Sequence, residues 1–288
     1  MRTRIIFSLK NRGAYVPFHH QYLLAQFIKG ILIFGPEKDY QQFTQFIFSG
    51  LKGQTKISRK GLHFYSSKVT LVFSCADKPF LDYFLAQLFE QKDIMIGSLH
   101  LTPESFEQEE VVQIAEAAKF LCISPIVPIQ AGFNDEQGKK FINPETDEFS
   151  DLLYDATISR MESTGKYTAE QIAAFYKFQI VPDSDYLQRI QATHKKFARI
   201  YPVYDNDVKF EVRGYTFPFT LYADPEVQRF VYENGLGYFC HKGFGMLDIA
   251  HNDSIKKDTE RELVYAERGL ADTRLYPINK SAWGWKAL

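Results

Sequence analysis

The sequence predicts an α+β fold, most clearly in its first half. Residues 3–9, 61–75 and 94–101 are rich in β-branched, aromatic and other apolar residues and are expected to be strands. Residues 19–34 and 78–90 instead repeat apolar residues at helical spacing. Because the segment 61–75 contains a turn between two apolar runs, the order of elements is β-α-β-β-α-β. This order is the ferredoxin-like, or RRM-like, arrangement.

The second half offers strand, helix and strand around an inserted helical region. Residues 119–129, KFLCISPIVPI, are expected to form a strand that prolines interrupt. Residues 151–179 and 183–197 are expected to be helices or helix pairs, and residues 209–222 a bent strand or hairpin. A short helix at 225–233 then leads through a glycine-rich loop into a last strand, FGMLDIA.

Composition excludes several classes of protein. The chain has 288 residues, of which 45% are hydrophobic and 24% charged, as in an ordinary globular protein. Its net charge is −1, so a nucleic-acid binder of this composition must gather its basic residues locally. The three cysteines are far apart and form no CxxC pair, which excludes a zinc ribbon. With no signal-peptide pattern and no apolar run of membrane-spanning length, we expect a reduced, cytoplasmic protein.

The glycine-rich loop GLGYFCHKGFGMLDI, residues 235–249, is the sharpest motif. It is neither a Walker A loop nor a Rossmann fingerprint, because both of those lead into a helix and this loop leads into a strand. Glycines allow the backbone to approach a polyanion closely, and His241 and Lys242 would add charge-assisted contacts. The alternative is a tight helix-to-strand turn. The four glycines of the motif are Gly235, Gly237, Gly243 and Gly245.

The loop ending GFG before the last strand resembles that of the repeat-associated RNA-binding (RAMP) superfamily of CRISPR systems. Within it, the chain resembles the CRISPR-associated endoribonucleases that cut precursor CRISPR RNA in its repeats, the sixth Cas family. VPFHHQYLLAQFIKGI resembles the first helix of that family, and FLCISPIVPI resembles the Ser-Pro strand that opens its second domain. The resemblance covers roughly residues 1–250. It implies two tandem ferredoxin-like domains at 1–117 and 118–250, the second with a helical insertion, and leaves 251–288 as an extension of unknown role.

The resemblance also implies an activity and its partners. The family cuts RNA without a metal or other cofactor, using the 2′-hydroxyl beside the scissile phosphate and leaving a 2′,3′-cyclic phosphate. The implied partner is CRISPR repeat RNA, both precursor and mature guide. Other CRISPR effector or adaptation proteins, and a second copy of the chain, are left open as further partners. An unrelated nucleotide-binding enzyme of ferredoxin-like fold is another alternative, and the weakest one.

The first helix supplies four catalytic candidates: Lys29, His19, His20 and Tyr22. Lys29 falls where family members place a catalytic Tyr, Lys or Arg, although a solvated lysine near a helix end is the competing interpretation. Helical geometry puts His19, Tyr22 and Lys29 on one polar stripe. His20 falls on the apolar stripe, so a buried or capping role competes with catalysis for it, and the family's histidine at this place is not the cutting residue.

The segment after the first helix departs from the family pattern. Many members carry a catalytic histidine there, whereas YQQFTQFIFSG contains none. Either His19 takes that role, or lysines act without a histidine, or the chain is a repeat-RNA-binding subunit of a CRISPR effector complex that does not cut.

A basic stretch, LKGQTKISRKG, follows that segment. In the family, a lysine in this region completes the catalytic site. We prefer Lys52 to Lys56 for this role, because the Lys-Gly dipeptide at Lys52 aligns more naturally with the family. Lys56, Arg59 and Lys60 are expected RNA contacts, with a solvated basic loop as the alternative. The basic run HKKFAR, residues 194–199, is a further candidate for gripping phosphates, or else a charged helix face.

Overall fold

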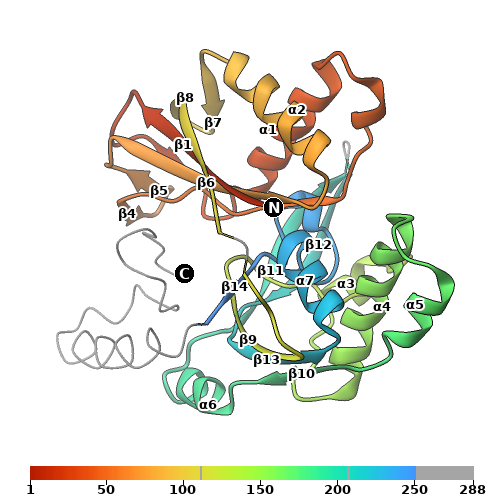
Figure 1. The fold of residues 1–288 in the computed structure, drawn as a ribbon. Helices are drawn as coiled ribbons and strands as arrows, with labels where there is room; N and C mark the ends of the chain where they lie inside the picture. Colours follow the sequence, from red (N-terminus) through yellow and green to blue (C-terminus); the bar gives the residue numbers. More distant parts are fainter. Residues whose placement is uncertain (111, 206–207, 251–288) are drawn as a thin grey trace.

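The structure is a computed structural model that describes residues 1–110, 112–205 and 208–250 (Figure 1). Two halves, each with its own antiparallel sheet, lie one above the other in Figure 1, with the first half in red to yellow and the second in green to blue. The extension expected at 251–288 lies outside the described residues.

The first half has the ferredoxin-like topology that the sequence predicts. Its five-stranded sheet has the order β3-β6-β1-β8-β7, in which β7 is an added edge strand. The remaining order corresponds to strands two, three, one and four of a β-α-β-β-α-β unit. The elements are β1 (Arg2–Leu9), α1 (Gln21–Phe34), β3 (Phe46–Phe48), β6 (Lys68–Cys75), α2 (Lys78–Glu90), β7 (Ile94–Ile96) and β8 (Leu99–Gln108).

One face of this sheet packs on both helices. Ile5, Phe7 and Leu9 alternate along β1 with less buried residues, as a strand with one buried face requires. They share a core with Leu24 of α1 and Phe84 of α2. The core thus fixes α1 against the sheet; Tyr22 and Lys29 lie in this helix, and His19 and His20 directly precede it.

A small three-stranded sheet is attached to the first half. Its order is β2-β5-β4, with β2 (Tyr15–Val16), β5 (Gly61–Phe64) and β4 (Thr55–Ser58). Strand β2 leads directly into α1, and the basic stretch 51–61 forms β4 and its turn into β5.

The second half repeats the same topology. Its main sheet has the order β10-β13-β9-β14, which again corresponds to strands two, three, one and four. The ferredoxin-like prediction is therefore confirmed for both halves. The elements are β9 (Ala117–Cys122), α3 (Asp135–Lys139), α4 (Asp147–Ser163), α5 (Ala169–Ala174), β10 (Phe178–Pro182), β13 (Phe219–Ala223), α7 (Pro225–Asn234) and β14 (Leu247–Ile249).

The insertion of the second half contains a hairpin as well as a helix. Helix α6 (Ser184–Ala192) is followed by β11 (Ala198–Asp205) and β12 (Val208–Tyr215), which pair only with each other in the described sheets. The bent strand or hairpin expected at 209–222 is wrong, because this segment forms β12 and β13, which belong to different sheets. The single strand expected at 94–101 is likewise interrupted, because Gly97 turns the chain between β7 and β8 at a φ of 59°.

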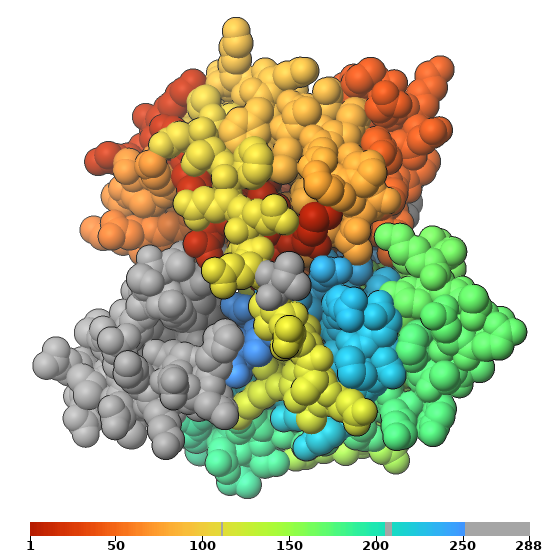
Figure 2. Space-filling model, in the orientation of Figure 1, coloured from red at the N-terminus to blue at the C-terminus, as the bar shows by residue number. Residues whose placement is uncertain are grey.

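The two halves are in direct contact. A small apolar cluster joins Ile47 and Val72 of the first half to Cys240 and Met246 of the second. The buried Arg2 donates from Nη1 to the carbonyl oxygen of Leu247 across the boundary, at 2.6 Å. In Figure 2 the yellow connecting segment runs across the front from the upper half to the lower. None of the helices in the described part of the chain has the length and apolar character that a bilayer crossing needs.

Candidate functional site

The start of α1 is covered by two segments of the second half. The ring of His19 lies 4.7 Å from that of Tyr201, edge to face, and the ring of Tyr22 lies 5.0 Å from that of Tyr204. Lys242, in the short helix η2 (Cys240–Lys242) of the glycine-rich loop, donates from Nζ to the carbonyl oxygen of Tyr204 at 2.7 Å. We call this meeting of α1, the β11–β12 hairpin and the glycine-rich loop the α1 junction.

The electrostatics of the α1 junction suit proton transfer. Burial, and next the positive charge of Arg199 on β11, lower the pKa of the His19 imidazole below its usual 6.5. The half-buried His19 is therefore largely neutral near pH 7 and able to accept a proton. Burial, and next Tyr204, raise the pKa of the Tyr22 phenol, which keeps its proton and remains a hydrogen-bond donor.

His20 is fully buried and holds the chain after β3 against α1. The backbone N–H of Leu51 donates to His20 Nε2 at 3.0 Å, and Nδ1 lies 3.2 Å from the carbonyl oxygen of Pro17. Since Nε2 accepts, the proton belongs on Nδ1, which donates to Pro17. Burial lowers the pKa of His20 to about 4. These contacts match the buried role that competes with catalysis for His20.

Replacing His20 by Ala is expected to cost stability, because it leaves the buried Leu51 N–H without its acceptor. The loss should be about 1–3 kcal/mol for the unsatisfied donor alone. In the wild-type protein, the free energy of unfolding should decrease as the pH falls from about 6.5 towards about 4. The reason is that His20 takes up a proton at a higher pH in the unfolded chain than in the folded protein. Urea unfolding at several pH values measures both effects. An equal pH dependence in His20→Ala would contradict the assignment.

Lys29 lies on the exposed face of α1, away from the α1 junction. His19 precedes the helix, and Lys29 lies eight residues after Gln21, the first residue of α1, so the helical rise places Lys29 about 12 Å further along the axis. The catalytic role of Lys29 stays a prediction.

Lys52 is buried between the halves and is only 1% exposed. Burial holds the pKa of its ammonium group well below the usual value, and the carboxylates of Asp248 and Glu109 oppose this shift. Its backbone pairs with Thr70 beside the main sheet. The proposed catalytic role of Lys52 thus requires RNA to reach a position that both halves cover.

The remaining basic candidates of the first half are exposed. Lys56 lies on β4 with its Nζ 4.9 Å from the centre of the Tyr65 ring, and Arg59 and Lys60 occupy the turn into β5. The side chains of Lys56, Arg59 and Lys60 are therefore accessible to RNA, as their predicted role requires.

The glycines of the loop are buried and serve close packing. All four have positive φ values, between 80° and 87°. A Cβ on Gly243 would lie 2.7 Å from the Phe48 ring and 3.3 Å from Gln21 of α1, and one on Gly245 would lie 2.0 Å from the Leu236 carbonyl oxygen. The loop can therefore approach α1 closely only because Gly243 has no side chain. His241 and Lys242 are partly exposed, as are Tyr238 and Phe239.

Comparison with known proteins identifies the second half of the chain. Residues 107–249 match the family model described as CRISPR associated protein Cas6, C-terminal. The chain carries a Cas6 C-terminal domain. The family resemblance predicted from the sequence is thereby confirmed.

Similar proteins found by the other comparisons agree with this family match. The chain is 24% identical over 242 residues to the CRISPR-associated endoribonuclease Cas6 1 of Methanocaldococcus jannaschii, which covers 81% of this chain and 86% of the relative. A solved Cas6-related protein from Pyrococcus furiosus superposes with a TM-score of 0.71 at 20% identity, covering 88% of this chain and 99% of the other. A RAMP protein described as binding different RNA substrates gives 0.70 at 20% identity, covering 87% and 100%. These two superpositions establish a shared fold.

Within the Cas6 domain, Arg160 of α4 holds the glycine-rich loop in place. Its Nη1 donates to the Gly235 carbonyl oxygen at 2.8 Å, and its Nη2 donates to that of Asn234. It also lies 3.0 Å from Cys240 Sγ. Arg160 thus fixes the helix-to-loop turn that carries Lys242.

Sequence reasoning missed the tyrosines of the α1 junction. Tyr201 and Tyr204 lie on β11, a strand that the sequence pattern did not predict, and Arg199 was considered only within a basic run. Along β11, Tyr201 and Val203 are buried whereas Pro202 and Tyr204 are partly exposed, an alternation that the residue types do not show because tyrosine occupies both kinds of position.

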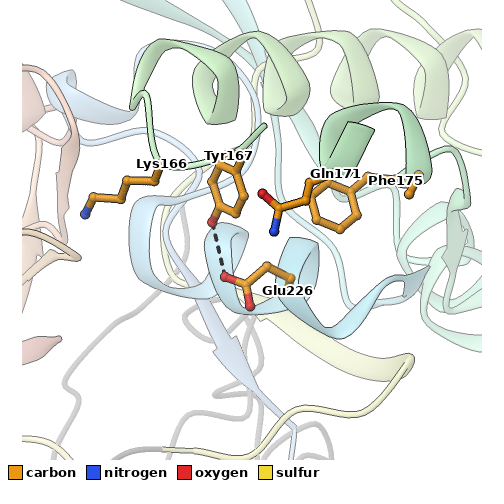
Figure 3. A pocket seen from close by; sticks show the side chains of 6 residues that line it. Lys166, Tyr167, Gln171, Phe175 and Glu226 are labelled. Atoms are coloured by element: carbon orange, nitrogen blue, oxygen red, sulfur yellow. Dashed lines mark hydrogen bonds between the residues drawn. The ribbon is translucent and has the colours of Figure 1, made fainter. Parts of the chain in front are cut away.

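A separate cavity of about 540 Å³ lies in the Cas6 domain between α5 and α7 (Figure 3). The Tyr167 hydroxyl donates to Glu226 Oε1 at 3.2 Å in its wall, and burial, with Glu226, raises the pKa of Tyr167 to about 12. None of the predicted site residues lines this cavity. In the described residues, no three His, Cys, Asp or Glu side chains gather as ligands for a metal ion.

Proposed function

We propose that the protein is a metal-independent endoribonuclease that binds precursor CRISPR RNA and cleaves it within its repeats to give mature guide RNAs. The Cas6 domain and the curated endoribonuclease relative support the substrate and the reaction class. The observation that carries the proposal is the α1 junction, in which the partly buried His19 packs on Tyr201 and has a pKa lowered by burial and by the positive charge of Arg199.

In the proposed reaction the 2′-hydroxyl beside the scissile phosphate is the nucleophile. Its oxygen forms a bond to phosphorus while the bond to the 5′-oxygen breaks, which leaves a 2′,3′-cyclic phosphate and a 5′-hydroxyl. The proton of the 2′-hydroxyl must go to a base, and the leaving 5′-oxygen must receive one. Negative charge grows on the phosphate oxygens and needs a cation or hydrogen-bond donors.

We assign these roles to the α1 junction. His19 is the base, because its lowered pKa leaves it unprotonated near neutrality. Arg199 is the cation, and Tyr22, which keeps its proton, is the donor to the leaving 5′-oxygen. The candidate catalytic roles of Lys29, Lys52 and His20, and the RNA contacts of the glycine-rich loop, stay predictions.

A non-cleaving repeat-RNA-binding subunit is the second candidate function. It is favoured by two specific observations. The segment after α1 contains no histidine, and Lys52 is covered by both halves.

The test is a cleavage assay on labelled RNA that contains the cognate repeat, performed in EDTA. Cleavage should persist, and its upstream product should carry a cyclic phosphate or 3′-phosphate. A single 2′-deoxy substitution at the nucleotide before the cut should abolish cleavage and leave binding unchanged. Activity that stops on chelation would contradict metal independence. Tight binding without a cut in any condition would favour the second function.

Alanine substitutions at the catalytic candidates apportion the roles in the same assay. Each has a matched control: His100→Ala, a partly exposed histidine on β8, for the histidines, and Lys38→Ala, an exposed lysine after α1, for the lysines. The substituted candidates are His19, His20, Lys29, Lys52 and Lys56. Unfolding curves of each variant separate loss of chemistry from loss of fold.

A further inference from the structure

The outer face of the small sheet β2-β5-β4 gathers aromatic and basic side chains in one row. Tyr15 lies opposite His63 in the β2–β5 pair, and Lys56 lies opposite His63 in the β4–β5 pair. Directly opposed residues of antiparallel strands project to the same side. Tyr65 follows His63 by two residues and is 44% exposed. The other side of the sheet is apolar and buried, as Val16 and Leu62 show.

The contacts between these side chains hold the row in a fixed geometry. The ring of Tyr15 lies 5.2 Å from that of His63. His63 Nε2 lies 2.8 Å from the Ser58 hydroxyl, and its Nδ1 lies 2.8 Å from the carbonyl oxygen of Gly13. Because both ring nitrogens are engaged, the imidazole plane has a set orientation, and Lys56 lies over the Tyr65 ring.

The charge around this face is of one sign. Residues 1–36 and 40–76, which contain all three strands, include no Asp or Glu. Arg59 and Lys60 are exposed in the turn at one end of the face, and Arg12 is exposed in the loop before β2. In the adjoining main sheet, Glu104 is already paired with Lys68. The face thus complements a polyanion.

We propose that this face binds a single-stranded segment of RNA, with bases stacked on Tyr65 and the Tyr15–His63 pair and phosphates held by Lys56, Arg59 and Lys60. Stacking on aromatic rings beside cations is the way proteins hold unpaired nucleotides, whose ring faces are free. A paired stem offers no such faces to a row of rings.

The position of the face fits the proposed reaction. Tyr15 precedes His19 by four residues, so their Cα atoms lie within about 14 Å of each other. A strand bound on the face can therefore continue to the α1 junction. The inference deepens the proposed function and rests on it for the identity of the RNA, which would be an unpaired part of the repeat.

Binding of a fluorescein-labelled oligouridylate of about 12 nucleotides tests the proposal without any cleavage. Tyr65→Ala should weaken binding about 5- to 150-fold, the range found when one stacking ring is removed. Tyr65→Phe, which keeps the ring, should bind as the wild type does. The matched control is Tyr222→Ala, on β13, where the tyrosine is 49% exposed.

Salt dependence tests the phosphate contacts. Removing Lys56, Arg59 and Lys60 together should lower the slope of log affinity against log salt by about 2, or about 0.7 for each lost contact. Photocross-linking with 4-thiouridine should label the peptides that contain residues 13–16 and 55–65. An equal effect of Tyr65→Ala and Tyr222→Ala, or cross-links only elsewhere, would overturn the proposal. Since the probe carries no repeat, a failure to cut repeat RNA would leave this result standing.

Discussion

Replacing His19 by Ala is expected to lower the cleavage rate of repeat RNA by about 10²–10⁴-fold, the usual contribution of a positioned general base. The affinity for uncut repeat RNA should change far less, because a neutral imidazole acts in the proton transfer and makes no charged contact with the phosphates. Single-turnover cleavage with enzyme in excess measures the first effect and filter binding of 2′-deoxy RNA measures the second. Rates equal to those of His100→Ala would remove His19 from the mechanism.

The pH profile sharpens this prediction. Because burial and Arg199 lower the pKa of His19, the acidic limb of kcat/KM should have its midpoint below 6.5. The rate should be lost as the pH falls through that midpoint and should be level above it. In Arg199→Gln the positive charge is gone, so the midpoint should move up towards the ordinary value, in addition to any loss of rate. A midpoint that does not move would show that Arg199 lies too far from His19 to act on it.

Replacing Gly245 by Ala should cost about 3–5 kcal/mol of stability or prevent folding of the second half. A Cβ there would lie 2.0 Å from the Leu236 carbonyl oxygen, at a φ of 80° that L residues rarely adopt. The Leu236 N–H, which donates to the Gly245 carbonyl oxygen at 2.9 Å, would be displaced with it. Thermal and urea unfolding measure the loss.

Gly132→Ala is the matched control for the glycine prediction. Gly132 has a φ of 73°, similar to that of Gly245, but a Cβ there would meet nothing within 4 Å. It should show only the cost of the left-handed backbone, about 1–2 kcal/mol. Equal losses in the two variants would mean that the loop relaxes to accept a side chain. That outcome would contradict the close packing of Gly245 against Leu236 within the loop.

The fold follows largely from local patterns. The helix predicted at 78–90 matches α2, because apolar residues recur every three or four positions and the Asp77 side chain accepts the Phe80 N–H at 2.9 Å. The glycine-rich loop stands between α7 and β14 as its helix-loop-strand order predicts. Both signals lie within one element or its ends, so the sequence contains them.

The sequence alone established the ferredoxin-like order, the family resemblance and the polar stripe of α1. Only the tertiary structure shows which of these residues meet the second half of the chain, namely His19 and Tyr22. Burial is the main cause that lowers the pKa of His19 and raises that of Tyr22, and Arg199 and Tyr204 of the β11–β12 hairpin, respectively, add to these shifts. Lys52 is buried as well, among charged groups of both halves that include Glu109 and Asp248. Desolvation and long-range contacts create these environments, and neither leaves a local periodicity from which it could be predicted.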